Sequence, residues 1–254
     1  MTGLRVDFEW RITLFTVILV PALIGLGFWQ LSRAEEKAAL ATLFDARAQQ
    51  APASLNEIAL WDSSADALGY LPVELEGELV QDSYLLLDNR ILAGRYGNEV
   101  VALVNLGNGT SVLVNRGWVQ SDPARLSMPD VPQPGGKWSS QGHIYVAPGD
   151  PYLLAEQPFE GSWPMTVQAL EMQKLVPIVQ AKTGTRLFPY PVRLNAGEDL
   201  ALDIDWQVVN VRPEKHRGYA VQWFAMAGML ALLYGLRSTN LWQLISQRKG
   251  KSSQ

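Results

Sequence analysis

The sequence predicts an α+β membrane protein, in which two transmembrane helices flank an antiparallel β-rich extramembrane domain with one inserted helix. Three observations support this fold class. Uncharged apolar runs occupy residues 12–31 and 219–236. Much of the chain between them alternates polar and apolar residues, as half-buried strands do. Within that interval, residues 167–182 place their apolar side chains at helical spacing instead.

The two apolar runs are long enough to cross a bilayer. They read ITLFTVILVPALIGLGFWQL and YAVQWFAMAGMLALLYGL. At about 1.5 Å per residue they span roughly 30 and 27 Å, close to the hydrocarbon thickness of a membrane. A cleaved signal peptide is the alternative for the first run, but no small-x-small cleavage site follows it. A buried soluble helix is the alternative for the second run, which is uncharged and followed by a basic tail.

Two spans place both chain ends on one side of the membrane. The predicted segments between and beyond the helices are a short N-terminus (1–11), a central domain (32–218) and a tail (237–254). The tail has no acidic residue and carries Arg237, Arg248, Lys249 and Lys251. Positive charge is retained in the cytoplasm, so we expect cytoplasmic termini and a periplasmic central domain, although basic residues also flank the helices on the opposite side.

Charge and composition narrow the location and the partners. The N-terminus contains two acidic residues and no amphipathic, Arg/Ser-rich stretch, so it does not resemble a mitochondrial transit peptide. We therefore expect a multi-pass protein of a bacterial inner membrane, in contact with lipid. The net charge is -4 although the ends are basic, and an acidic central domain argues against nucleic acid as a partner. The absence of cysteine excludes disulfides, thiolate catalysis and cysteine-based metal sites.

The elements of the central domain follow from spacing and turn chemistry. The first helix is expected to continue to about Gln50, because SRAEEKAALATLFDARAQQ has helical spacing. Alternation predicts strands at 71–78, 84–89, 99–105, 111–118, 142–146, 187–195 and 201–211. The Asn-Gly pair in LGNGT predicts a hairpin at 106–110, and PARLSMPDVPQPGG predicts a long loop. The inserted helix is expected to bend or break at Pro177.

Enzyme chemistry has little support in the sequence. Two histidines, distant in sequence, fall short of a typical metal-ligand set. His143 with a serine and Asp88 or Asp122 could form a triad, but no GxSxG motif occurs and His143 lies in an alternating strand. Paired carboxylates recur at every second residue of predicted strands, which is typical of a solvated face. We therefore expect a protein that is not an enzyme.

An Asn-Arg pair closes an apolar strand twice. Asn89 and Arg90 end LLLDNR, and Asn115 and Arg116 lie in VLVNRGW. We expect the asparagines to adopt turn conformations and the arginines to form buried or interfacial ion pairs that fix the sheet. Contact with a partner carboxylate or a ligand propionate is the alternative for both arginines.

Four sequence blocks resemble the signature blocks of the surfeit locus protein 1 family. They are GFWQLSRAEEK (27–37), LLLDNRILAGRYGNEV (85–100), VLVNRGWV (112–119) with Arg125 and Pro129 after it, and PEKHRGYAVQWFAMA (213–227). Their order is that of the family, and they cover both membrane anchors and the domain between them. The last block is the most specific.

The resemblance implies an assembly factor for haem-copper cytochrome c oxidase that binds haem a and presents or inserts it into subunit I. Subunit I and haem a synthase are the partners that it implies. Some bacterial members of the family are thought to bind haem a through the histidine of the last block. That position is His216 here, which makes its imidazole the expected axial ligand of the haem iron.

The residues near His216 suit that role. On a helix, His216, Tyr219, Ala220 and Trp223 share a face that offers an imidazole and two flat rings. Trp29 and Gln30 end the first apolar run at the same membrane depth and are expected to form the opposite wall. Basic side chains on the aqueous side, suited to haem propionates, are Arg212, Lys215 and Arg217.

Other interpretations of the same residues remain open. Trp and Tyr are enriched at membrane interfaces as anchors, and basic residues at helix ends contact lipid head groups. The chain is then a haem-free scaffold that stabilises oxidase subunits during assembly. An exported hydrolase that uses His143 is a third hypothesis.

Overall fold

The computed structural model describes residues 8–56, 61–147, 149, 151, 153, 156–159, 162–206 and 212–240. The chain divides into two compact units. One consists of residues 1–42 and 208–254, and the other of residues 43–207. We call them the helix unit and the β unit. The basic residues predicted at 248–251 lie outside the described residues.

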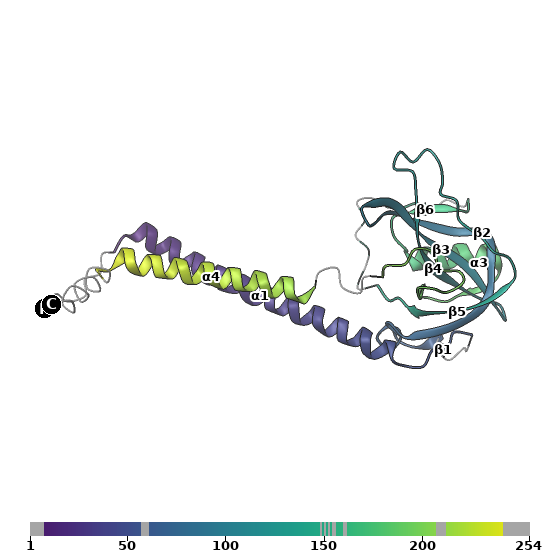
Figure 1. The fold of residues 1–254 in the computed structure, drawn as a ribbon, viewed down its shortest axis with the longest axis horizontal. Helices are drawn as coiled ribbons and strands as arrows, with labels where there is room; N and C mark the ends of the chain where they lie inside the picture. Colours follow the sequence, from purple (N-terminus) through teal and green to yellow (C-terminus); the bar gives the residue numbers. More distant parts are fainter. Residues whose placement is uncertain are drawn as a thin grey trace. The chain divides into compact units, whose positions relative to one another are not determined.

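The helix unit contains two long helices that lie side by side (Figure 1). They are α1, Trp10–Ala48, of which residues 43–48 belong to the β unit, and α4, Pro213–Ser238. Both are long and apolar enough to cross a membrane. The expected continuation of the first helix to about Gln50 is therefore confirmed. Helix α4 begins six residues before the predicted 219, at Pro213. Proline is favoured in the first turn of a helix, because backbone N–H groups there have no carbonyl partner within the helix. His216 is thus part of the helix.

A narrow seam of small side chains joins α1 to α4. The buried residues of α1 are Thr16, Leu23, Gly27 and Ala34, and those of α4 include Ala220 and Ala227. They recur at intervals of four and seven residues, the spacing of helices that pack along one stripe. Small side chains allow the two backbones to approach closely, as is common between helices in membranes.

The β unit is built on an eight-stranded sheet (Figure 1). Its strands are β1 (Ala53–Ser54), β2 (Pro72–Leu92), β3 (Arg95–Gly107), β4 (Thr110–Gln120), β5 (Lys137–Ile144), β6 (Met165–Val167), β7 (Arg186–Leu187) and β8 (Val192–Leu194). Two helices accompany them, α2 (Ala65–Leu68) and α3 (Met172–Thr183). The pairings β2–β3–β4–β8–β5–β2 form a closed ring, so the sheet returns to its first long strand.

The α+β class with two flanking helices is confirmed, but the sheet is mixed rather than purely antiparallel. The long strands β2, β3 and β4 pair antiparallel, as expected. The short strands β1, β6, β7 and β8 each make a parallel pairing with β2 or β4. Each of these reaches its neighbour through a long connection, which parallel pairing requires.

Several predicted boundaries need correction. The strands expected at 71–78 and 84–89 form one strand, β2, because a register shift between Leu79 and Tyr84 absorbs the interruption. Of the strand expected at 201–211, the described part contributes only an isolated bridge from Asp203 to Trp118, and 207–211 lie outside the described residues. Part of the helix expected at 167–182 belongs to β6 or to loop.

Helix α3 continues through Pro177, where a bend or break was expected. Leu175 and Val179, on either side of the proline, are fully buried. Burial of that apolar face offsets the single hydrogen bond that Pro177 removes. The hairpin at 106–110 is confirmed, with Asn108 and Gly109 at φ values of 51° and 73° between β3 and β4.

Both faces of the central strands are buried. Along β3, Val100, Ala102 and Val104 belong to one apolar cluster, which also contains Phe188. The alternate residues of the same strand belong to a second cluster, where they pack with Leu175 and Val179 of α3. The central strands therefore pack against apolar side chains on both faces.

Candidate functional site

His216 and Gln30 meet across the two helices of the helix unit. Gln30 follows Gly27 by three residues along α1, and His216 precedes Ala220 by four along α4, so both lie on the seam. The Nδ1 atom of His216 is 2.7 Å from Oε1 of Gln30, and both side chains are partly buried. The structure therefore joins two residues that are 186 positions apart in the chain.

This hydrogen bond determines which nitrogen of His216 is available. The amide oxygen of Gln30 only accepts hydrogen bonds, so Nδ1 of His216 carries the proton and donates it. In the neutral imidazole the lone pair is then on the other ring nitrogen, Nε2, which makes no hydrogen bond within the described residues. A neutral imidazole, oriented through one nitrogen and open at the other, is the form in which histidine binds metal ions.

The other predicted site residues differ in exposure. Ala220 is buried beside His216 on the seam, and Trp223 is half-buried. Tyr219 and Trp29 are 52% and 50% exposed and lie off the seam. Such exposed rings can contact either a flat ligand or lipid head groups. Exposed basic residues of the first turn and its cap are Arg212, Lys215 and Arg217.

Two further contacts hold the helices in this pairing. The ring of Phe224 packs over Gly27, so closely that a Cβ atom on Gly27 would be 2.5 Å from it. At the other end of the seam, the hydroxyl oxygens of Thr13 and Tyr234 are 2.9 Å apart. Neither contact was predicted from the sequence, although the heptad spacing of small residues that includes Gly27 was a usable signal.

The first Asn-Arg pair stabilises the end of β2. Asn89 has a φ of 57°, a left-handed conformation that asparagine tolerates better than most residues. Arg90 places Nε 3.4 Å from Oε1 of Glu99, and its carbonyl oxygen accepts a 3.0 Å hydrogen bond from the indole of Trp118. These contacts cross from β2 to β3 and β4.

The second pair uses carbonyl groups in place of the expected ion pair. Arg116 is 2% exposed and donates hydrogen bonds of 2.8 and 2.7 Å to the carbonyl oxygens of Leu200 and Pro132. Burial lowers the pKa of its guanidinium. The carboxylate of Glu99 accepts a 2.6 Å bond from Asn115, so Glu99 connects the two Asn-Arg pairs.

His143 is a buried, neutral residue of the β unit. It is 7% exposed, its ring contacts Phe44 edge-on at 5.6 Å between centroids, and burial lowers its pKa to about 4. The two acids considered as triad partners are engaged elsewhere. Asp88 binds Tyr96 and Arg125, and Asp122 accepts from backbone amides of its own loop. The structure does not assemble the hydrolase triad.

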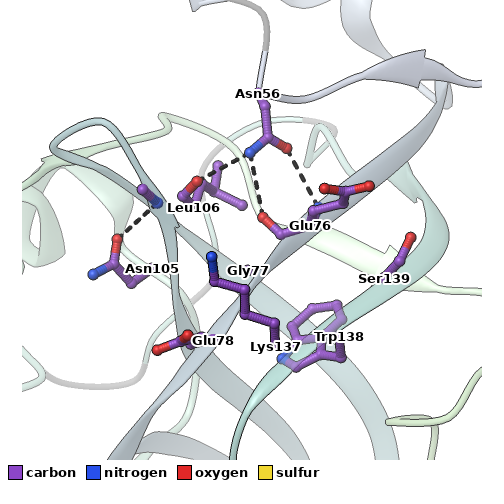
Figure 2. Close-up of a pocket in the computed structure, with 10 residues that line it drawn as sticks. Asn56, Glu76, Gly77, Glu78, Asn105, Leu106, Lys137, Trp138 and Ser139 are labelled. Atoms are coloured by element: carbon purple, nitrogen blue, oxygen red, sulfur yellow. Dashed lines mark hydrogen bonds between the residues drawn. The ribbon is translucent and has the colours of Figure 1, made fainter.

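A recess of about 480 Å³ in the β unit is lined by polar side chains (Figure 2). Asn56 bonds the backbone of Glu76 and the carbonyl of Leu106, at distances of 3.0 to 3.3 Å, and so fixes its own segment against β2 and β3. Lys137 and Trp138 lie opposite Asn56 in this view. Within the described residues, no group of three or more His, Asp or Glu side chains is placed to hold a metal ion.

Comparison with known proteins adds one family and one relative. A model of the SURF1 family matches residues 17–228, a span that includes Gln30, the β unit and His216. A SURF1-like protein of Dictyostelium discoideum is 32% identical over 116 residues. That alignment spans 43% of this chain and 43% of the relative, so less than half of the relative is compared.

Proposed function

The chain belongs to the SURF1 family, a family of cytochrome c oxidase assembly factors rather than of enzymes, and we propose that it binds haem a through His216 and presents it to oxidase subunit I. The proposal places the chain in a bacterial inner membrane, with the β unit in the periplasm and both termini in the cytoplasm. Haem a is transient cargo, and haem a synthase is its proposed donor.

The hydrogen bond between Gln30 and His216 is the observation that supports this proposal most directly. An axial ligand of haem iron must offer an unprotonated ring nitrogen in a fixed orientation. Gln30 holds the proton on Nδ1, which leaves Nε2 for the iron. The seam fixes both backbones beside this pair, so the imidazole is oriented before any ligand arrives.

The surrounding side chains fit the rest of a haem molecule. Trp29 and Tyr219 are exposed aromatic residues of the helix unit and suit a flat macrocycle. Arg212, Lys215 and Arg217 offer positive charge to propionates at the N-terminal end of α4. The apolar side chains around the two helices suit the long apolar tail of haem a.

The proposal is tested by co-expressing the chain with haem a synthesis, purifying it in detergent and recording haem content and the Soret band. His216→Ala is expected to abolish the bound haem. Gln30→Leu removes the acceptor and is expected to weaken haem binding roughly 10–100-fold, the usual effect of losing a partner of a metal ligand. Gln30→Glu keeps an acceptor for Nδ1–H and serves as the matched control, with haem retained.

Two outcomes would contradict the proposal. An unchanged Soret band and haem content in His216→Ala would exclude this imidazole as the ligand. A colourless parent protein that still co-purifies with subunit I would favour the haem-free scaffold.

A further inference from the structure

Exposed apolar side chains of the β unit gather at two neighbouring loops. Ile91 lies near the end of β2, and Leu126 and Met128 lie in the loop that follows β4. Their exposed fractions are 74%, 88% and 59%. The other large hydrophobic residue of the described β unit that is strongly exposed is Leu43, at 44%. Water contact of aliphatic side chains is unfavourable, so their concentration at one place requires an explanation.

A polar network binds the two loops together. Arg125 places Nη2 2.8 Å from the carboxylate of Asp88 and 3.1 Å from the amide oxygen of Asn89. The hydroxyl of Tyr96 donates to Asp88 at 2.6 Å, and the backbone N–H of Ser121 donates to the carbonyl of Tyr96. Ile91 pairs with Tyr96 across the hairpin, so both side chains lie on one face of it.

The loop that carries Leu126 has a defined conformation. The carboxylate of Asp122 accepts hydrogen bonds of 2.9 and 3.1 Å from the N–H groups of Ala124 and Leu126. Arg125 has a φ of 57°, which is costly for a residue with a side chain. Leu126 is therefore held outward by a specific arrangement, and a partner would not have to order it on binding.

Around these two loops, the arginine side chains are exposed and the carboxylates are largely buried. The side chains of Asp88 and Glu99 are only 11% and 18% exposed, and each is paired with an arginine. Arg125 is 60% exposed, and Nη1 takes no part in its contacts with Asp88, Asn89 and Tyr96. Arg95, the residue before Tyr96, is exposed on the opposite face of the hairpin, 5.2 Å from the ring of Trp118. The face that carries Ile91 thus offers apolar side chains and the oriented guanidinium group of Arg125.

We propose that Ile91, Arg125, Leu126 and Met128 form a docking surface, here called the tip surface, for an extramembrane protein that offers an apolar hollow bordered by carboxylates. Under the proposed function, on which this choice of partner rests, that protein is part of the assembling oxidase. Arginine is enriched at the energetic centre of protein interfaces, and apolar side chains that lose contact with water add to the binding free energy.

A protein partner fits the tip surface better than a bilayer does. Of the residues enriched where proteins enter the membrane interface, Trp and Lys are absent from the tip surface, and the neighbouring Tyr96 has its hydroxyl engaged by Asp88. Beside it lies a recess of about 360 Å³, lined among others by Leu126, Met128 and Thr166. A fixed projection next to a hollow provides shape for recognition, which a fluid lipid surface does not require.

The first experiment compares oxidase co-purification between surface variants of the full chain in detergent. The double variant Leu126→Asp with Met128→Asp is expected to reduce co-purified oxidase roughly tenfold or more, because two apolar anchors are lost. Leu43→Asp changes an exposed leucine outside the tip surface and is the matched control, with co-purification retained. Arg125→Gln is expected to weaken the complex, whereas Arg95→Gln, which changes an exposed cation on the opposite face of the same hairpin, is expected to leave it unchanged.

Haem content, measured in the same samples, separates this inference from the proposed function. A tip variant that keeps its haem and loses the oxidase supports the docking surface. Undiminished co-purification in the double variant overturns the docking surface and leaves haem binding by His216 standing. Unfolding midpoints equal to that of the parent exclude general misfolding as the cause.

A second measurement tests the bilayer directly. The chain has no cysteine, so Leu126→Cys gives a single labelling site for an environment-sensitive fluorophore. In proteoliposomes of phosphatidylcholine and phosphatidylglycerol without oxidase, the probe is expected to report water. A blue-shifted emission quenched by lipid-attached quenchers would place residue 126 in the membrane and overturn the protein-docking proposal.

Discussion

The helix unit and the β unit are held together in different ways. Of the 39 residues of α1, four are buried, whereas β4 buries eight consecutive residues. The helices meet along a seam of small residues, with one hydrogen bond near each end. The β unit instead has apolar clusters on both faces of its central strands and a buried arginine whose hydrogen bonds end on carbonyl groups.

This difference separates adjustable from rigid parts of the molecule. Lipid is as apolar as the helix surfaces, so helices in a membrane associate through close packing and hydrogen bonds rather than through burial from water. A few local contacts therefore determine the orientation of His216. The β unit is stabilised instead by the removal of apolar side chains from water, which suits a unit that presents a surface to another protein.

The addition of one carbon atom inside the β unit is expected to cause a large loss of stability. A Cβ atom at position 97 would lie 2.2 Å from the carbonyl oxygen of Val119 and 2.4 Å from the ring of Trp118. A backbone oxygen in a paired strand cannot move freely, so Gly97→Ala is expected to destabilise the β unit by about 3 kcal/mol. Urea unfolding of the full chain in detergent, followed by tryptophan fluorescence, measures the loss.

The control for that substitution is Gly135→Ala, where a Cβ atom would meet no atom within 4 Å. Its unfolding midpoint should equal that of the parent. Equal midpoints for Gly97→Ala and the parent would show that β3 and β4 adapt more readily than a sheet buried on both faces should.

A smaller effect is expected from acidification of the β unit. The pKa of His143 is lowered from 6.5 to about 4, chiefly by burial and next by the nearby charge of Arg193, while a hydrogen bond with Asn195 opposes the shift. Between these two values the unfolded chain binds a proton that the folded chain does not. Stability is therefore unaffected by His143 above pH 6.5 and falls as the pH decreases towards 4, by about 2 kcal/mol at pH 5.

His143→Gln tests this dependence, because glutamine keeps polar atoms and does not titrate. The loss of unfolding free energy between pH 7 and pH 5 should be about 2 kcal/mol smaller in the variant than in the parent. Identical losses in the two proteins would show that His143 is protonated in the folded state.

The two units also differ in how well the sequence predicts them. Both long helices follow from uncharged apolar runs that are much longer than an ordinary strand. The sequence predicts two strands in place of β2, because polar residues around Asp82 interrupt the alternation. In the structure β2 continues through them, with Asp82 at a φ of 54° and a shifted register. Strands β1, β6 and β7 contain two or three residues, too few to show any period, and only their tertiary pairing defines them.

At the candidate site, spacing alone brought His216 and Gln30 to the same membrane depth. It did not predict that their side chains share a hydrogen bond, which depends on how the helices are rotated against each other. Rotation also decides the exposure of Tyr219. Ala220 and Trp223, four and seven positions after His216, remain near the seam. Tyr219, three positions after His216, is rotated about 60° away from it around the helix axis. The tip surface can be recognised only from the exposed fractions of its side chains, which a sequence does not contain.

The smallest expected loss of stability comes from the same one-carbon change made in the helix unit. At Gly27 the added carbon would meet the ring of Phe224 at 2.5 Å, nearly as close as the contacts at Gly97. The obstacle here is a side chain that can rotate towards lipid, so Gly27→Ala is expected to cost less than about 1 kcal/mol. A cysteine pair at Thr13 and Tyr234, whose hydroxyl groups meet across the two helices, reports the pairing through its rate of crosslinking by a bis-maleimide of matching length. Gly27→Leu should slow that rate more than Gly27→Ala, and Gly25→Leu, where a Cβ atom meets nothing within 4 Å, should not change it. Equal rates for the two leucine variants would show that the seam does not depend on close approach at Gly27.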